Sequence, residues 1–226
     1  MLDLRFFEIY RNPDYLQLLA EGAALSAVLT VAGGAIGFLL AVGLASARAA
    51  QVPVLGHLCA AYVEVIRNTP LIVQLFFVAF GLPGLLGYSW PFWAHAALAL
   101  TLNFSAYFAE ILRAGLFGVG TGQREAAAAL GLPRAVIFWR IVFPQAVAGM
   151  YASLNSQFIF LFLTTGVISE IGVEDLTHAG LFIDGRTFRS FEVFITLTVI
   201  YVAMALGFKA ALRALENRLF RWRAVA

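Results

Sequence analysis

One stretch of the chain decides its fold class: residues 22–47 read GAALSAVLTVAGGAIGFLLAVGLASA. These 26 residues lie between Glu21 and Arg48 and carry no charge. A helix needs about 20 apolar residues to cross the hydrocarbon core of a bilayer, and a charge at its centre costs about 2.5–3.5 kcal/mol. We therefore expect one membrane-spanning helix here, with a few residues to spare.

The composition of the whole chain also indicates a membrane protein. Apolar residues make up 62% and charged residues 12% of the 226 residues, against about 45–50% and 25% in soluble domains. A single cysteine, Cys59, excludes an internal disulfide, and the net charge of +2 gives no basic field for nucleic acid. His57, His95 and His178 lack the spacing of metal ligands, and no phosphate-binding loop or nucleophile motif occurs. We expect no metal, cofactor or catalytic residue in this chain.

The second uncharged window, residues 68–109, is 42 residues long and too long for one span. The sequences Gly81-Leu82-Pro83-Gly84 and Gly87-Tyr88-Ser89-Trp90-Pro91 predict a break, because glycine and proline interrupt helices. This window should form a hairpin of two helices. Residues 49–66 are moderately apolar and could extend the second helix on its inner side.

Two more uncharged windows complete the pattern. The 29 residues 141–169 predict a fourth helix, and the 16 residues 193–208 a fifth, extended through Lys209 by snorkelling. The sequence thus predicts an all-α membrane protein with five transmembrane helices. We expect three parts: an interfacial segment over residues 1–20, a transmembrane domain over 21–212, and a basic tail over 213–226.

The arginine and lysine distribution predicts the topology. With the N-terminus outside, eleven basic residues fall on inner segments and four on outer ones, which satisfies the positive-inside rule. The C-terminus and the longest loop, residues 114–144, would then be cytoplasmic. Within this loop Gly131 should end one helix and Pro133 should begin another. An amphipathic helix pair lying on lipid is one interpretation of this pattern.

The spacing within the loop favours another interpretation. The loop resembles the EAA loop of ABC importer permeases in the spacing of its residues. Glu125-Ala126-Ala127 is followed after three residues by Gly131, after nine more by Ile141, and after one more by Phe143-Pro144, where Phe143 takes the place of the usual leucine. The resemblance to the histidine/glutamine-type amino-acid branch extends over nearly the whole chain. It is carried by residues 62–74, by Ala106-Tyr107 with Glu110 and Arg113, by 122–127, by 144–146 and by 171–176.

The resemblance implies a type I ABC importer permease (MetI-like) fold and a set of partners. A second permease subunit, two ATP-binding subunits that hold ATP and magnesium, and an extracytoplasmic solute-binding protein would assemble with this chain in the cytoplasmic (inner) membrane. The loop would couple to the ATPase through Glu125, Ala126, Ala127, Gly131, Ile141, Phe143 and Pro144.

Polar residues in or near the spans are the candidates for the substrate path or its gate. Glu64 with Arg67 and Glu110 with Arg113 are three apart, so each pair can meet on a helix. Local ion pairs or headgroup anchors are the alternative to a gate. The full candidate set is Glu64, Arg67, Gln74, Tyr107, Glu110, Thr164, Thr165 and Glu170.

One departure from the family pattern concerns the pocket. Leu163-Thr164-Thr165-Gly166-Val167 stands where similar chains often carry Lys-Asp-Thr-Ser-Leu, so the aspartate that could face a substrate ammonium is missing. Glu170 is either an acid just outside the membrane or a carboxylate at the outer mouth of the path. If each of two paired permease chains forms half of the substrate pocket, the half from this chain carries no charge. This favours pairing with a different permease chain, which supplies the charge, over pairing with a second copy.

Other functions remain as alternatives from the sequence. A membrane-embedded enzyme needs a catalytic carboxylate or histidine cluster within the spans, and the uncharged windows hold none. An ion-coupled transporter acting without an ATPase needs buried acids within its spans. Such a transporter leaves the loop unexplained. A membrane scaffold that binds partners without transport is a third alternative.

Overall fold

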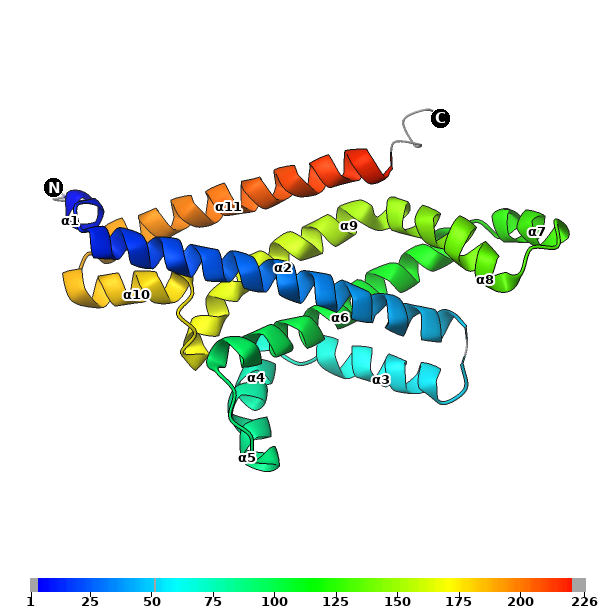
Figure 1. Cartoon of the computed structure of the whole chain (residues 1–226), viewed down its shortest axis with the longest axis horizontal. Helices are drawn as coiled ribbons and strands as arrows, with labels where there is room; N and C mark the ends of the chain where they lie inside the picture. The colour runs from blue at the N-terminus through cyan, green and yellow to red at the C-terminus, as the bar shows by residue number, and fades with distance from the viewer. Residues whose placement is uncertain (1–3, 51, 221–226) are drawn as a thin grey trace. The chain divides into compact units, whose positions relative to one another are not determined.

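The computed structural model describes residues 4–50 and 52–220, and all secondary structure in this part of the chain is helical. Five long helical stretches follow one another (Figure 1): α2 (Pro13–Ala49), α3 (Leu55–Arg67) with α4 (Leu71–Phe76), η1 (Phe77–Gly81) and α5 (Leu82–Leu86), α6 (Phe92–Gly118), α9 (Phe143–Thr164) and α11 (Ser190–Leu219). The shorter elements are α1 (Phe7–Tyr10), α7 (Thr121–Ala129), α8 (Arg134–Val136), η2 (Ile137–Val142), η3 (Thr165–Ile171) and α10 (Leu176–Thr187).

Three helical stretches among the described residues are long and apolar enough to cross a membrane: Pro13–Ala49, Arg134–Ile171 and Ser190–Leu219. Leu55–Arg67 together with Leu71–Leu86 makes a fourth when the two are counted as one broken span. Helix α6 has 27 residues, which at 1.5 Å per residue is about 40 Å and long enough to cross a bilayer. The chain is an all-α membrane protein, as the uncharged windows predict.

Helix α2 begins at Pro13, so residues 13–20 of the expected interfacial segment are helical and continuous with the first long helix. Proline suits the first turn of a helix because its missing N–H would have no partner there. At the other end α11 continues to Leu219, so the expected tail starts as helix. Residues 1–3 and 221–226, which include Arg221 and Arg223, lie outside the described residues.

The predicted hairpin of two helices is present, and its break lies at residues 87–91 but not at 81–84. This tetrapeptide lies inside a continuous helical stretch from Leu71 to Leu86, in which the π-helical turn of η1 precedes Pro83. A widened turn relieves the clash between a proline ring and the preceding carbonyls. The helix ends instead at Gly87, which adopts a φ of +70°, and residues 88–91 form the connection to α6.

The extension expected for residues 49–66 is also wrong. The chain forms a separate helix, α3, that ends at Arg67, and α4 begins only at Leu71. Pro70 explains the interruption, since it disfavours helical backbone at Thr69 and donates no N–H. The side chain of Asn68 donates to the carbonyl oxygen of Glu64 at 2.8 Å and so satisfies one of the last carbonyls of α3.

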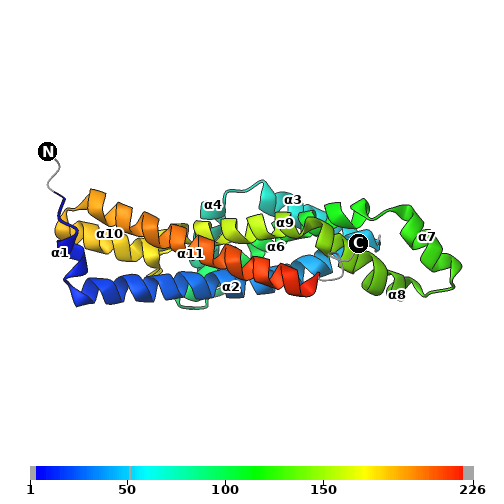
Figure 2. The ribbon, with the colours of Figure 1, turned by 90° about the horizontal axis from the view of Figure 1, so that it is seen from above.

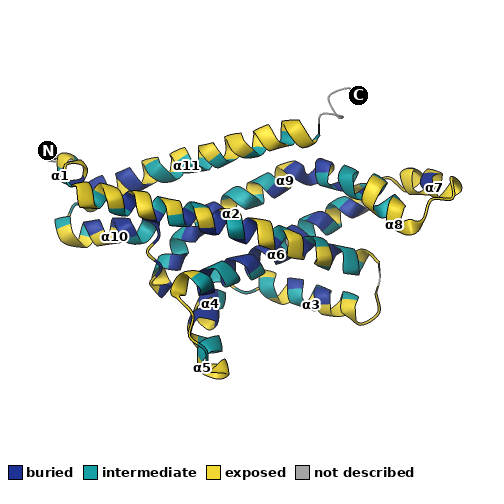
Figure 3. Ribbon diagram, in the orientation of Figure 1, coloured by how far each residue is buried: buried dark blue, intermediate teal, exposed yellow. Residues whose placement is uncertain are grey.

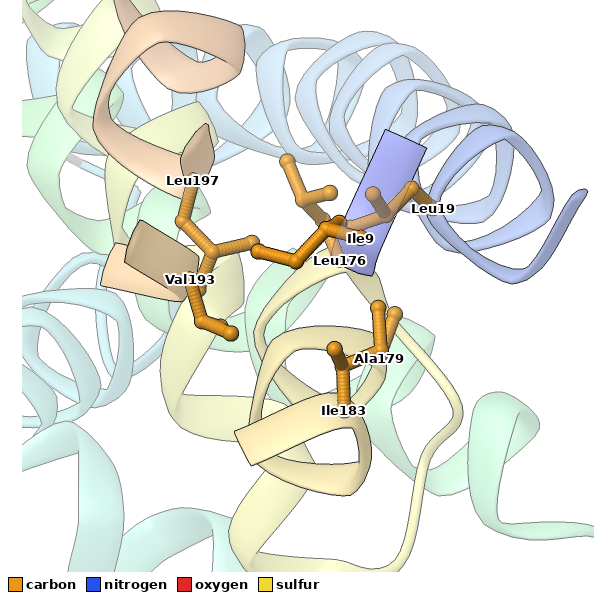
Figure 4. Close-up of a cluster of buried hydrophobic side chains, with 7 residues drawn as sticks. All are labelled: Ile9, Leu19, Leu176, Ala179, Ile183, Val193 and Leu197. Carbon is orange, nitrogen blue, oxygen red and sulfur yellow. The ribbon is translucent and has the colours of Figure 1, made fainter. Parts of the chain in front are cut away.

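The chain divides into two compact units. The first comprises Met1–Ala35, Pro70–Thr101 and Phe158–Ala211, and the second comprises Ile36–Thr69, Leu102–Gln157 and Leu212–Ala226. A buried apolar cluster lies within the first unit (Figure 4), where α1, α2, α10 and α11 contribute Ile9, Leu19, Leu176, Ala179, Ile183, Val193 and Leu197. Each of these residues is at most 5% exposed.

Polar contacts fasten α1 to the start of α11 in this unit. The backbone N–H of Arg5 donates to Glu192 Oε1 at 2.9 Å, and Arg189 pairs with Glu8 at 3.3 Å. The hydroxyl groups of Tyr10 and Thr196 lie 2.8 Å apart. Since Ile9 is also buried, α1 is anchored to protein and is not a helix that rests on lipid alone.

Asp175 and Glu192 are buried acids of the first unit, and Asp175 is the less exposed of the two. Asp175 caps the N-terminus of α10, where Oδ1 accepts from the backbone N–H of His178 at 2.9 Å. Its side chain is 0% exposed, and Oδ2 has no hydrogen-bond partner among the described residues. Burial raises the pKa of the Asp175 carboxyl from 3.8 to about 6, although hydrogen bonds from the backbone of His178 and Thr177 act in the opposite direction.

We expect Asp175→Asn to stabilise the protein at neutral pH. The folded-state pKa lies above the unfolded one, so the folded chain binds more protons between about pH 4 and 6 and loses stability as the pH rises through that window. Asparagine is an equally good cap that cannot ionise. The thermal unfolding midpoint of the variant at pH 7.5 should exceed that of the wild type by several degrees, and the difference should shrink towards pH 5. A difference that does not depend on pH would contradict this reasoning.

Candidate functional site

The candidate coupling loop folds as an elbow, residues 121–142, whose two arms are α7 and the stretch formed by α8 and η2. Figure 2 shows the arms meeting at a bend. Gly131 lies at this bend with a φ of +74°, in the left-handed region that favours glycine. Its N–H donates to the carbonyl of Ala128 at 2.9 Å, and Pro133 takes the N-cap position of α8. The helix–glycine–helix pattern predicted for the loop is therefore present.

Helix α7 is exposed on nearly all sides (Figure 3). Within Thr121–Ala129 only Ala127 is buried, at 3% exposure, while Glu125 and Ala126 are open to the surroundings. Leu130, next to the bend, is 79% exposed. Helix α7 therefore contacts its own chain through Ala127 and through the Arg124 side chain, which donates to the carbonyl of Leu116, and it leaves the Glu125 carboxylate exposed.

The remaining coupling candidates lie where the elbow joins α9. Ile141 and Phe143 are half-buried, and the Phe143 ring lies 5.2 Å from that of Trp139 and 6.1 Å from that of Phe138. Pro144 lies within the first turn of α9, directly after the π-helical turn of η2. Gln145 donates its side-chain amide to the carbonyl of Ile141 at 2.9 Å. The wide turn and this side-chain bond let the chain enter α9 at a proline without a break.

Glu110 is the centre of an ionic cluster within the second unit. Its Oε2 accepts from Arg48 Nη1 of α2 at 3.1 Å, and its Oε1 accepts from Arg113 Nε at 2.9 Å. The pair between Glu110 and Arg113 that the i,i+3 spacing predicts is therefore formed. Arg48 was not among the predicted site residues, because no local pattern connects positions 62 residues apart.

The second predicted pair is not formed. Glu64 accepts from the side chain of Asn68 at 2.9 Å, and the guanidinium of Arg67 lies over the ring of Tyr107, 5.6 Å from its centroid. Among the described residues, Glu64 and Arg67 share no ion pair. Tyr62, one turn earlier on α3, donates to the carbonyl of Leu102 at 2.9 Å and further ties α3 to α6. Its place was not predicted, since a tyrosine among apolar residues gives no pairing signal.

The other path candidates belong to the first unit. Thr165 is 0% exposed, donates to the carbonyl of Phe162 at 2.7 Å, and also contacts the hydroxyl group of Tyr201 on α11. Thr164 is half-buried and donates to the carbonyl of Leu161 at 2.8 Å. Gln74 on α4 is half-buried, and Glu170 near the end of η3 is exposed. The roles of these residues in a path or gate stay predictions.

We expect Glu110→Ala to destabilise the second unit, since it leaves Arg48 and Arg113 without their shared carboxylate. Hydrogen bonds to charged groups are worth about 1.5–3 kcal/mol, and the partial exposure of the cluster lowers this figure. A loss of about 1–2 kcal/mol should lower the thermal unfolding midpoint by about 2–8 °C. Glu64→Ala is the matched control, because the carboxylate of the exposed Glu64 accepts a hydrogen bond from the neighbouring Asn68 side chain and forms no ion pair with a described residue. Equal shifts of the unfolding midpoint in the two variants would show that the Glu110 cluster does not stabilise the fold more than an exposed glutamate does.

The chain matches the family described as "Binding-protein-dependent transport system inner membrane component" over residues 19–221, which include the elbow and the Glu110 cluster. The chain belongs to this family. It is therefore a membrane component of a transport system that depends on a binding protein.

The chain is similar to permease proteins of amino-acid transport systems and to solved structures of ABC transporters. It is 32% identical to the L-cystine transport system permease protein TcyL of Bacillus subtilis (94% of this chain, 92% of the relative) and 34% identical to the glutamine transport system permease protein GlnP of Escherichia coli (90% and 94%). A crystal structure of an amino acid ABC transporter with histidines matches with a TM-score of 0.86 at 33% identity, over 96% of this chain and all of that one. The inward-facing MetNI methionine ABC transporter shares the fold, with a TM-score of 0.78 at 19% identity over 92% and 99%.

Proposed function

We propose that this chain is the permease subunit of an ATP-driven importer of amino acids or close derivatives, and that its elbow receives the motion of the ATPase. The exposure of α7 around Glu125-Ala126-Ala127, with the left-handed Gly131 at its end, is the observation that carries the proposal. Relatives at 32–34% identity that are named for cystine and glutamine support the substrate class.

The proposed mechanism uses the exposed helix α7 and the continuous connection from the elbow to α9. ATP closes the two ATPases, which carry the elbow with them because α7 is seated in a groove of the partner. The arm formed by α8 and η2 continues into α9, so the force reaches a membrane span directly. The Glu110 cluster links α2 to α6 through Arg48, and the contact of Arg67 with the ring of Tyr107 links α3 to α6 within the same unit. ATP and magnesium would be held by the partner ATPases, and this chain contributes the path and the lever.

An outside N-terminus and a cytoplasmic C-terminus complete the proposal. Eleven basic residues against four support this orientation, which places the elbow where a cytoplasmic ATPase can reach it. A cytoplasmic reporter enzyme fused after Ala226 should be active, and a reporter that works only in the periplasm should be silent there. The reverse result would overturn both the orientation and the coupling role of the elbow.

We also propose that the partner permease is a different, homologous chain. The stretch at residues 163–167 carries no charge for a substrate ammonium, and Thr165 is buried, so the charged half of the pocket would come from the partner. Substitution of Thr164 and Thr165 by valine should then weaken uptake only modestly. Full uptake by a transporter that contains two copies of this chain and no other permease would exclude the heterodimer.

The decisive experiment is reconstitution. This chain, a partner permease and an ABC ATPase should co-purify and hydrolyse ATP in liposomes faster when a loaded solute-binding protein is present outside. Uptake of a panel of radiolabelled amino acids into the same liposomes identifies the solute. Uptake driven by an ion gradient without ATP would instead support the ion-coupled alternative, and a chain that binds the partners without uptake would support the scaffold.

A further inference from the structure

A cavity of about 700 Å³ lies within the second unit, behind the elbow. The end of α2, the end of α6, α7 and the arm formed by α8 and η2 surround it. Its lining residues are Ser46, Ala49, Ala50, Leu116, Arg124, Ala128, Arg134, Ala135, Ile137, Phe138, Trp139 and Val142. The volume falls in the range of about 300–1,000 Å³ that is typical of small-molecule sites. The coupling function described above does not use this space.

The charged part of the lining is entirely basic. Arg124 and Arg134 face the cavity, and no acidic side chain lines it. One guanidinium nitrogen of Arg124 donates to the carbonyl of Leu116, which fixes this side chain at the wall. Arg134 is exposed and forms no ion pair with a carboxylate of the described residues. Guanidinium groups match the geometry of phosphate, so the charged end of the cavity is suited to a phosphate-bearing ligand.

The remaining lining is apolar and aromatic. Ile137, Phe138 and Val142 of η2 contribute larger apolar side chains, and Ala49 of α2 and Ala128 of α7 contribute small ones. Trp139 is half exposed at 50% and also lines the cavity. Tryptophan is enriched at the level of lipid headgroups. A ligand of this cavity would therefore carry an anionic head and an apolar tail.

We infer that the cavity binds an anionic phospholipid of the cytoplasmic leaflet, with its phosphate at Arg124 and Arg134 and the upper part of an acyl chain against Ile137, Phe138 and Val142. Basic pockets beside transmembrane helices on the cytoplasmic side are suited to such headgroups. The inference rests on the orientation proposed above, which places the elbow at the inner surface. A lipid at this place would support the angle between the two arms from behind.

Native mass spectrometry of the purified transporter complex tests the inference. The complex is titrated with phosphatidylglycerol or with phosphatidylcholine of the same acyl chains, and the bound lipids are counted. The variants are Arg134→Gln, Arg134→Lys, and Arg140→Gln as the matched control. Arg140 is also an exposed arginine, six residues further on, and does not line the cavity. A third titration contains millimolar inorganic phosphate, which separates a lipid site from a site for a free anion.

We expect preferential retention of phosphatidylglycerol that weakens about fivefold in Arg134→Gln, as loss of one basic contact near a membrane surface implies. Arg134→Lys and Arg140→Gln should retain it, and inorganic phosphate should not displace it. Equal retention of both lipids, equal losses in Arg134→Gln and Arg140→Gln, or displacement by phosphate alone would each overturn the inference. Lipid counts do not depend on transport, so a failure here leaves the proposed function intact, and a failure of ATP-driven uptake leaves the lipid result intact.

Discussion

Gly131→Arg should abolish ATP-driven uptake while the protein still accumulates in the membrane. Gly131 has a φ of +74°, and an arginine in the left-handed region costs about 1–2 kcal/mol, which favours a different exit from α7. Apart from the two adjacent residues, no described residue has an atom within 4 Å of the position of a Cβ there, so the fold itself can accept the side chain. The partner ATPase cannot, because the new side chain projects from the bend of the docking elbow. Uptake and binding-protein-stimulated ATP hydrolysis should fall at least about tenfold, the effect of 1.4 kcal/mol on docking.

Three companion variants separate the causes. Gly131→Asn should be nearly normal, since asparagine tolerates left-handed backbone and adds little bulk. Gly131→Ala adds strain without bulk and should fall between the two. Gly185→Arg makes the same exchange in α10, at an exposed glycine that also has no atoms within 4 Å and no positive φ, and should leave uptake unchanged. If Gly131→Arg imports and hydrolyses normally, the elbow is not the contact with the ATPase.

The elbow could be predicted from the sequence because its geometry depends on local chemistry. A left-handed residue at a helix end selects glycine almost by itself, and Pro133 two positions later restricts where the next helix begins. The uncharged windows predicted α2, α9 and α11 for an equally local reason, namely the cost of a charge in the bilayer. In each case the deciding residues lie within one or two turns of the feature that they determine.

The interruptions of the second span show where local reasoning fails. Pro83 and its neighbouring glycines have the composition of a loop, yet the helix continues through them with a π-helical turn before the proline. Pro70 was not predicted to interrupt the helix, and it does. Both positions carry a proline, so the outcome depends on what packs around each one and whether the freed carbonyls find a partner. That information is not present in the spacing of residues.

In the candidate site, too, local spacing predicts some contacts and misses others. The pair of Glu110 and Arg113 follows from helical spacing, whereas the pair of Glu64 and Arg67 has the same spacing and is not formed. Tyr107, which receives Arg67, and Arg48, which completes the Glu110 cluster, come from other helices. Spacing predicts which side chains can meet on one helix, and tertiary packing decides which of them do.

Gly22→Ala should destroy the packing of the first unit. A Cβ at position 22 would lie 2.7 Å from the carbonyl oxygen of Asp175 and 2.9 Å from the Cα of Leu176. These are backbone atoms at the start of α10, where Ser26 Oγ also accepts from the N–H of Leu176 at 3.3 Å, so they cannot rotate away as a flexible side chain would. Overpacking costs about 1–3 kcal/mol when side chains yield, and the cost should lie at or above the upper end here. A decrease in the thermal unfolding midpoint of at least about 6 °C is expected.

Gly43→Ala provides the matched comparison on the same helix. Gly43 is exposed and has no atom within 4 Å of a Cβ position, so the same methyl group meets open space. Alanine is a better helix former than glycine by about 1 kcal/mol, and this variant should unfold at the wild-type temperature or slightly above it. The two variants have the same composition and differ only in where the methyl group is placed. A Gly22→Ala protein as stable as Gly43→Ala would mean that α2 and the start of α10 lie further apart than in this structure. It would also contradict the burial of Asp175, which lies at this contact.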